Sequence, residues 1–130
     1  MWKEILPDNC PPSSAHELDV VIFRILKDNE PSEADFINYS KLYPNNPRYR
    51  NLCKAYAISF YDSESNLLSA YKMSVEKGNV IGTHLAQYLL KKEHGRAEYK
   101  TVNGHYSVWF YQGWNFNDFE AVIVKPINAN

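Results

Sequence analysis

Residues 96–111, RAEYKTVNGHYSVWFY, decide the fold of this chain. Two runs that alternate between apolar and polar residues flank Asn103-Gly104, and this dipeptide is the strongest short-range signal for a β-hairpin. A two-residue turn also fixes which residues of the two strands face each other. The stretch therefore predicts two antiparallel strands, 96–102 and 105–111, joined by a tight turn.

That turn sorts the side chains of the hairpin onto two faces. Val102 would pair with His105, and most apolar side chains of both strands would share the core face. Trp109 and Tyr111 fall on the opposite face, together with Arg96. Two interpretations of these rings remain open: arginine and lysine stems or a packed helix cover them, or they form a stacking surface for a ligand or partner.

Periodicity and end signals predict the remaining elements. Three further strands and two helices are expected: strands 18–27, 54–61 and 119–125, a helix from Ser32 to Pro44, and a helix capped by Asp62 or Ser63 that ends at Gly78. Residues 83–92 fit either a helix or a strand. With an irregular segment at 1–16 and a loop at 44–53, we predict one α+β domain over 1–130, with an antiparallel sheet of about five strands and two main helices.

Composition and charge favour some classes of protein over others. The chain has 130 residues with 14 basic and 15 acidic side chains, a net charge of −1, so no basic field supports nucleic-acid binding. No apolar run has the length of a membrane span, and no signal-peptide pattern begins the chain. Cys10 and Cys53 do not resemble a disulfide framework. We therefore predict a cytoplasmic, reduced protein that binds neither nucleic acid nor membrane.

The sequence carries no recognisable catalytic or metal-binding motif. The histidines are isolated and lack the spacing of zinc ligands; they are His16, His84, His94 and His105. No nucleophile elbow and no glycine-rich phosphate loop occurs. We predict no metal and no cofactor, and we interpret Cys10 as a small loop anchor.

Arg24 interrupts the otherwise apolar strand LDVVIFRILK. An arginine stays charged, so its burial requires a carboxylate, several carbonyl groups or an anionic ligand. One interpretation is structural: Arg24 lies at an edge in water or pairs with Glu120. The other places Arg24 in a cleft that binds a ligand.

Two resemblances to known proteins rest on short stretches of the chain. The opening LPDNCPPSSA at residues 6–15, together with the later G-H-x-x-x-W from Gly104 to Trp109, resembles small uncharacterised bacterial proteins with an L-P-x-x-C-P-P-x-x-A pattern. That resemblance covers most of the chain and implies a shared fold without an established activity. It also implies that residues 83–92 are extended.

The second resemblance rests on Arg24, Ser59 and Glu120, which follow one another on predicted strands. This order is similar to ADP-ribosyltransferases of the arginine–serine–glutamate type. It implies that Arg24 contacts the phosphate or ribose of NAD, that Ser59 supports the nicotinamide pocket, and that Glu120 stabilises an oxocarbenium-like centre. The chain lacks the Ser-x-Ser pattern and the E-x-E or Q-x-E motif of those enzymes.

The favoured hypothesis is a non-catalytic binding module from a bacterium, such as an immunity protein, an antitoxin or a defence accessory. Its partner would be another protein or a small ligand, and a homodimer is a further option. The predicted aromatic surface comprises Trp109, Tyr111, His105, Arg96 and Trp114. Arg24 is predicted as a further binding residue outside this surface. The alternative is an ADP-ribosyltransferase-like or nucleotide-binding domain.

Overall fold

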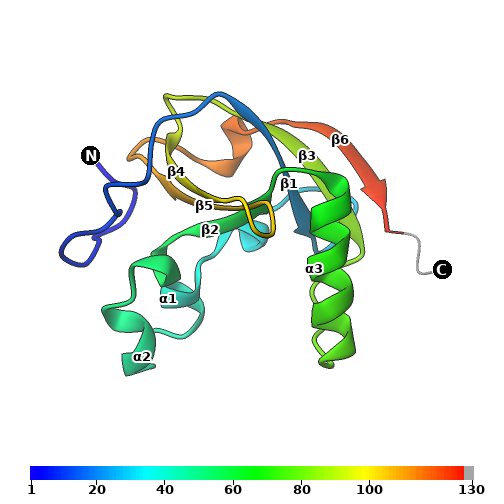
Figure 1. The fold of residues 1–130 in the computed structure, drawn as a ribbon, viewed down its shortest axis with the longest axis horizontal. Helices are drawn as coiled ribbons and strands as arrows, with labels where there is room; N and C mark the ends of the chain where they lie inside the picture. The colour runs from blue at the N-terminus through cyan, green and yellow to red at the C-terminus, as the bar shows by residue number, and fades with distance from the viewer. Residues whose placement is uncertain (128–130) are drawn as a thin grey trace.

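A single antiparallel sheet of six strands forms the body of the molecule (Figure 1). The computed structural model describes residues 1–127, apart from the side chain of Asp118. The strands are β1 (Val20–Leu26), β2 (Ile58–Tyr61), β3 (His84–Leu90), β4 (Gly95–Lys100), β5 (His105–Phe110) and β6 (Ala121–Pro126). Their order across the sheet is β4-β5-β2-β1-β3-β6, so β1 and β2 lie in its centre.

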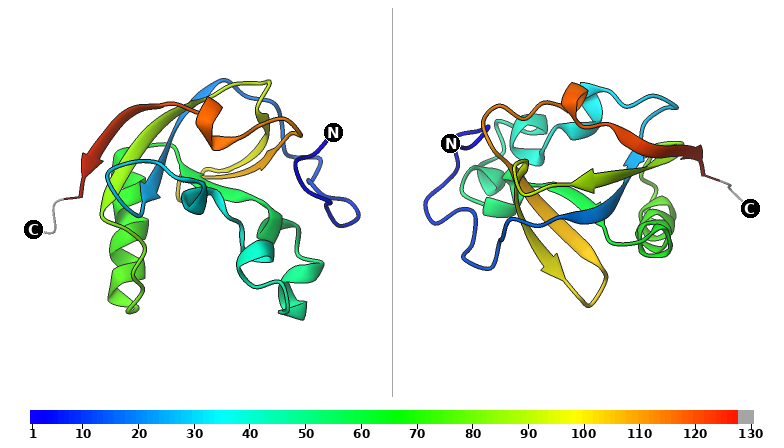
Figure 2. Two further views of the ribbon diagram at one scale, coloured as in Figure 1. Left: turned by 180° about the vertical axis from the view of Figure 1, so that it is seen from behind. Right: turned by 90° about the horizontal axis from the view of Figure 1, so that it is seen from above.

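One long helix and several short turns accompany the sheet. Helix α3 (Glu64–Glu76) begins at Ser63, whose hydroxyl accepts from the Asn66 amide, and a left-handed Gly78 (φ +88°) follows it. The shorter elements are α1 (Tyr39–Leu42), α2 (Pro47–Arg50) and the 3₁₀ turns η1 (Glu33–Phe36), η2 (Cys53–Tyr56) and η3 (Phe116–Asp118). Figures 1 and 2 show α3 and the α1–α2 pair projecting from the same side of the sheet, at opposite ends.

The fold is mostly sheet, so the prediction of about five strands and two main helices is right only in outline. The helix expected from Ser32 to Pro44 is two separate turns, η1 and α1. The extended backbone of Ile37 ends η1, and Asn38, which is also extended, caps α1 because its side-chain oxygen accepts from the Lys41 amide. Phe36 consequently points into the core while Tyr39 is exposed.

Two other segments also differ from the expectation. The predicted strand 54–61 begins with the turn η2, and only Ile58–Tyr61 pairs as β2. The predicted loop 44–53 contains α2, which Asn46 caps ahead of Pro47. The ambiguous segment 83–92 is the strand β3, which pairs with β1 along its whole length.

The predicted hairpin is present, but its register is shifted by two residues. Lys100 pairs with His105, so the turn spans Thr101–Gly104 in place of the predicted two-residue turn. Only Gly104 has a positive φ (+71°), whereas a two-residue type I′ turn needs positive φ at both central positions. A shift of two residues preserves the alternation of side chains, so the predicted sorting of the two faces is correct.

An aromatic cluster fills the core on one face of the sheet. It comprises Phe36, Phe60, Tyr88, Phe110, Trp114 and Phe119. Two stacked pairs hold it together: Phe110 with Trp114 at 3.8 Å and Tyr88 with Phe119 at 4.4 Å between ring centroids. Residues from η1 and from the segment after β5 thus close this face, while α3 packs against β1 and β2.

Candidate functional site

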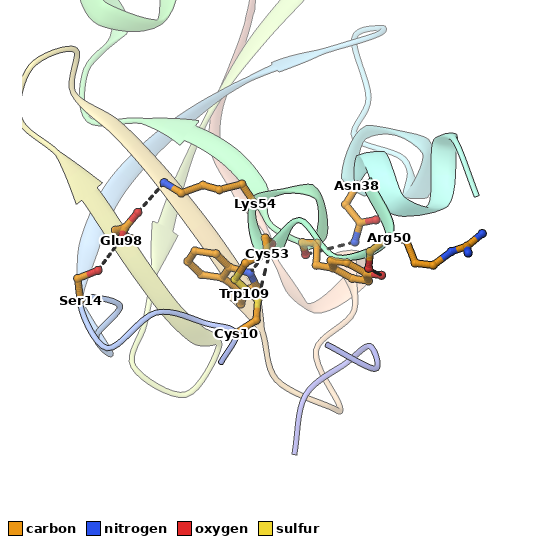
Figure 3. The surroundings of a disulfide bond; sticks show 9 residues. Cys10, Ser14, Asn38, Arg50, Cys53, Lys54, Glu98 and Trp109 are labelled. Atoms are coloured by element: carbon orange, nitrogen blue, oxygen red, sulfur yellow. Dashed lines mark hydrogen bonds and ion pairs between the residues drawn. A yellow bond between two sulfur atoms is a disulfide. The ribbon is translucent and has the colours of Figure 1, made fainter. Parts of the chain in front are cut away.

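Trp109 lies under the N-terminal segment and is only 1% exposed. Its indole nitrogen donates to the Cys53 carbonyl oxygen at 3.1 Å (Figure 3). The N-terminal segment hydrogen-bonds to both strands of the hairpin, away from its turn: the Lys3 amide donates to the Phe110 carbonyl of β5, and His16 exchanges two backbone hydrogen bonds with Ala97 of β4. The ring predicted at the centre of an exposed aromatic surface is therefore part of the interior.

A disulfide between Cys10 and Cys53 fastens this cover. It links the N-terminal segment to the start of η2, next to the Trp109 ring (Figure 3). The sequence-based expectation of unpaired cysteines is therefore wrong. That expectation came from the small number of cysteines, but two are enough for one bond when the fold brings them together across 43 positions.

Glu98 of β4 is the centre of a polar cluster beside the disulfide. Its carboxylate accepts from the Ser14 hydroxyl and from the Lys54 ammonium group, the latter at 2.5 Å (Figure 3). The hydrogen bonds from Lys54 and then Ser14 hold the pKa of Glu98 below its usual value. Burial, and next the charge of Lys54, lower the pKa of the neighbouring His105. The cluster ties three distant segments together.

The other predicted surface residues do not form one patch. Trp114 is 8% exposed and belongs to the core. Tyr111 packs against Trp2 in a tilted ring contact, 4.9 Å between centroids, and donates from its hydroxyl to Glu17. Arg96 is exposed and donates to the Tyr111 hydroxyl at 3.2 Å. His105 lies at the other end of β5, against Tyr61. The two tryptophans thus cannot present the contact surface that the sequence suggested.

Arg24 is satisfied partly by backbone carbonyl groups. Its Nε donates to the Asp35 carbonyl and its Nη1 to the Ser59 carbonyl, both at 2.7 Å. The guanidinium carbon lies 5.8 Å from the Phe36 ring centroid and 5.7 Å from that of Phe60. Burial lowers the pKa of Arg24, and the charge of Asp35 opposes this effect. Among the described residues no carboxylate forms an ion pair with it, so Glu120 is not its partner.

A groove of about 270 Å³ lies between Arg24 and α3. We call it the Arg24 groove; its polar rim and floor comprise Arg24, Ser59, Tyr61 and Ser74, and Ile25 and Ala70 add apolar surface. Tyr39 and Tyr71 complete its sides. The groove therefore combines a cation, hydroxyl groups and aliphatic carbon in one concave place.

The transferase resemblance requires Arg24, Ser59 and Glu120 to converge. Arg24 and Ser59 do line one groove. Glu120 precedes β6 at an edge of the sheet and lies beside Leu89 and His94 in a separate depression. The required convergence of all three side chains is not seen.

A second cluster of rings is exposed on α1 and α2, where the sequence analysis predicted no site. Tyr39, Tyr43 and Tyr49 contact one another with centroid distances of 5.7 to 6.1 Å. Tyr39 is 56% exposed and Tyr43 51%, and Leu42 beside them is 46% exposed. We call Tyr39, Leu42, Tyr43 and Tyr49 the tyrosine surface.

The chain around the tyrosine surface is basic. Residues 36–61 include four lysines and arginines and no Asp or Glu. Arg48 lies over the Tyr49 ring at 5.7 Å, and within the described part of the chain neither Arg48 nor Arg50 forms an ion pair. This run of charge was the signal in the sequence that could have indicated the surface.

The tyrosine surface is anchored from below. Asn38, which is 4% exposed, donates to Glu4 at 2.8 Å and to the Tyr56 carbonyl at 3.2 Å. The Tyr56 hydroxyl donates to the Arg50 carbonyl at 2.8 Å. Because the disulfide also joins this region through Cys53, two very short helices are held in place without a core of their own.

Among the residues with described side chains, no group of three His, Cys, Asp or Glu is placed to hold a metal ion. None of the helices in the described range has the length and apolar character needed to cross a bilayer. No protein family, curated protein or solved structure matches this chain.

Proposed function

We propose that this protein is a non-catalytic binding module that recognises an acidic partner protein through the tyrosine surface. The observation that carries the proposal is a group of three tyrosines in mutual ring contact, of which Tyr39 and Tyr43 are exposed, in a stretch of chain without acidic residues. Tyrosine and arginine are enriched where binding energy concentrates in protein interfaces.

The geometry supports binding at this place on energetic grounds. The three rings already hold one another, so little side-chain freedom remains to be lost on association. Arg48 and Arg50 supply positive charge that is not neutralised within the described chain, and such charge speeds encounter with an acidic surface. An immunity protein, an antitoxin or a defence accessory remains the proposed biological setting.

The disulfide indicates the kind of cellular compartment in which the protein works. Disulfides persist in oxidising compartments and are rare in the cytosol of most organisms. We therefore propose an oxidising compartment in place of the cytoplasmic location expected from the sequence. Alkylation of the protein in intact cells before lysis tests this: protection of Cys10 and Cys53 from the reagent supports it, and full labelling contradicts it.

The binding experiment compares wild type with the double variant Tyr43→Ser, Tyr49→Ser. A partner captured from the native host is purified, and its affinity for both proteins is measured by calorimetry. We expect at least a roughly tenfold loss of affinity in the double variant, because interface tyrosines often contribute more than about 1 kcal/mol each. Met73→Ser is the control, since Met73 is 59% exposed on α3 outside the surface.

Two further experiments test whether the tyrosine surface binds a second copy of this chain or a nucleic acid. Light scattering of wild type and the double variant tests a homodimer: a dimer mass that the variant reduces to a monomer would replace the proposal with self-association. A labelled single-stranded oligonucleotide tests the same basic and aromatic chemistry toward nucleic acid. Salt-dependent oligonucleotide binding lost in the double variant would likewise overturn the acidic-protein proposal, as would equal partner affinity of both proteins.

A further inference from the structure

The centre of the sheet opens at Arg24. The ladder between β1 and β2 consists of the single pair Phe23 and Tyr61, although both strands continue beyond it. The Arg24 side chain spans this opening, where its Nη1 reaches the Ser59 carbonyl. Arg24 therefore extends from the core side of β1 and lines the groove beside α3.

The guanidinium is held rigidly but is not fully used. Two of its nitrogens donate to carbonyl oxygens, and two aromatic rings flank it. Nη2 has no hydrogen-bond partner among the described residues, and no described carboxylate forms a direct ion pair with the guanidinium, although the charge of Asp35 acts on it from a distance. Its geometry is thus fixed in advance, with donor capacity left for an anion.

The other residues of the Arg24 groove can contact the uncharged part of an anionic ligand. Ile25 and Ala70 provide apolar surface, and the half-buried Tyr61 contributes a ring together with a hydroxyl for which no hydrogen bond is made within the described chain. A volume of about 270 Å³ is slightly below the usual range for drug-sized ligands, about 300–1,000 Å³. A compact molecule is therefore indicated.

We propose that the Arg24 groove binds a compact anionic ligand, whose carboxylate or phosphate group accepts from the Arg24 guanidinium and whose apolar body lies against α3. This proposal does not depend on the proposed protein-binding function, although the groove and the tyrosine surface share one residue. Tyr39 belongs to both places, so its substitution would not separate the two proposals.

The test is a titration of the intact, disulfide-bonded protein followed by NMR. Benzoate and phenyl phosphate are the anionic probes, and benzyl alcohol is the neutral comparison. We expect saturable shifts of the Arg24 side-chain Nε–H signal with at least one anion, and roughly tenfold or weaker affinity for benzyl alcohol, because hydrogen bonds to charged groups are the stronger ones. Which anion binds more tightly distinguishes a carboxylate ligand from a phosphate ligand.

Ala70→Leu tests the location of binding without removing Arg24. The larger side chain keeps a high helix propensity and fills the groove, so anion binding should be lost while the protein stays folded. Ser65→Leu introduces the same side chain at an exposed position of α3 and should leave affinity unchanged. Arg24→Lys retains the charge but lacks the planar fork, and we expect at least a roughly tenfold loss where it folds.

Three results would overturn the proposal. The first is the absence of saturable binding by either anion. The second is equal affinity for benzyl alcohol, because the charge would then play no part. The third is anion binding that survives in Ala70→Leu, because the ligand would then lie elsewhere. If Arg24→Lys does not fold, the pair Ala70→Leu and Ser65→Leu still decides the question.

Discussion

The indole of Trp109 donates its hydrogen bond to the carbonyl oxygen of Cys53, at a distance of 3.1 Å. Cys53 also forms the disulfide with Cys10, so the hydrogen bond and the disulfide both hold η2 and the N-terminal segment against the face of β5 that carries Trp109. The ring is consequently buried by a segment that begins some 100 positions earlier in the chain. This relationship moves the candidate contact surface from the hairpin to α1 and α2.

Replacing Trp109 with alanine should unfold the protein more readily. A fully buried large aromatic contributes burial and packing, and its truncation typically costs about 3–5 kcal/mol. We expect a loss of that order in the free energy of unfolding, measured with urea. Tyr43→Ala, at an exposed ring, should stay within about 0.5 kcal/mol of wild type. A loss below about 1 kcal/mol for Trp109→Ala would show that the ring lies outside the core.

Removing the disulfide should also lower stability. In the chain-entropy treatment, a crosslink across 43 positions stabilises the native state by about 4 kcal/mol through the unfolded chain. The double variant Cys10→Ser, Cys53→Ser should lose up to that amount in urea unfolding. The summed emission of the three tryptophans should shift to longer wavelength if the N-terminal cover over Trp109 loosens. An unchanged urea midpoint with an intact bond in wild type would contradict this account.

The sequence predicts those features of the fold that neighbouring residues determine, and it fails where contacts distant in the sequence determine them. The alternation on either side of Asn103-Gly104 predicts the correct faces of β4 and β5, and Ser63 and Gly78 predict α3 nearly to the residue. The turn length was wrong because long-range contacts stabilise the longer turn. Gly104 approaches Asp62, and its carbonyl accepts from the Asp62 amide at 2.8 Å.

The candidate sites were harder to predict because their surroundings are non-local. The alternation of β5 places Trp109 on the charged face, and nothing near it in the sequence shows that residues 1–16 cover that face. Arg24 was singled out because it interrupts an apolar strand and its burial would require partners, and whether it lies at an edge or in a cleft was left open. Its acceptors are backbone carbonyl groups of Asp35 and Ser59, which carry no sequence signature.

Protonation of Glu98 should lower the free energy of unfolding at acidic pH. Its folded pKa is lowered, first by the Lys54 hydrogen bond and then by Ser14. The stabilisation is therefore present above the unfolded value, about 4.3, and is lost as the pH falls through the lower folded value. Glu98→Gln should be less stable than wild type at neutral pH and should show a flatter decline below about pH 4.3. Parallel acid limbs for the two proteins would contradict this assignment.

Lys54 should influence two titrations at once. Because Lys54 is the largest cause that lowers the Glu98 pKa and the second cause that lowers that of His105, Lys54→Met should raise both values. NMR titration of the carboxyl carbon and the imidazole ring measures them. Lys100→Met is the matched control: Lys100 is the last of the influences on Glu98 and is not among those on His105. An unchanged His105 pKa in Lys54→Met would exclude the coupling.

Gly104→Ala should disturb the hairpin through two separable effects. The residue has φ +71°, where a side chain is strained, and an added Cβ would collide with the Asp62 carboxylate and the Asn66 amide nitrogen. Asp62 would have to move, although it accepts from Tyr99 at 2.6 Å and from Asn66 at 2.7 Å.

Gly113→Ala separates these two effects. Gly113 also has a positive φ (+98°), but a Cβ added there would meet nothing within 4 Å, so alanine brings only the backbone strain, about 1–2 kcal/mol. Gly104→Ala should lose clearly more stability than Gly113→Ala in urea unfolding, and its Tyr99 ring signals should shift as the bond to Asp62 is released. Equal losses for the two variants would mean that the contact of the turn with Asp62 contributes nothing, and that the four-residue turn is held by the glycine alone.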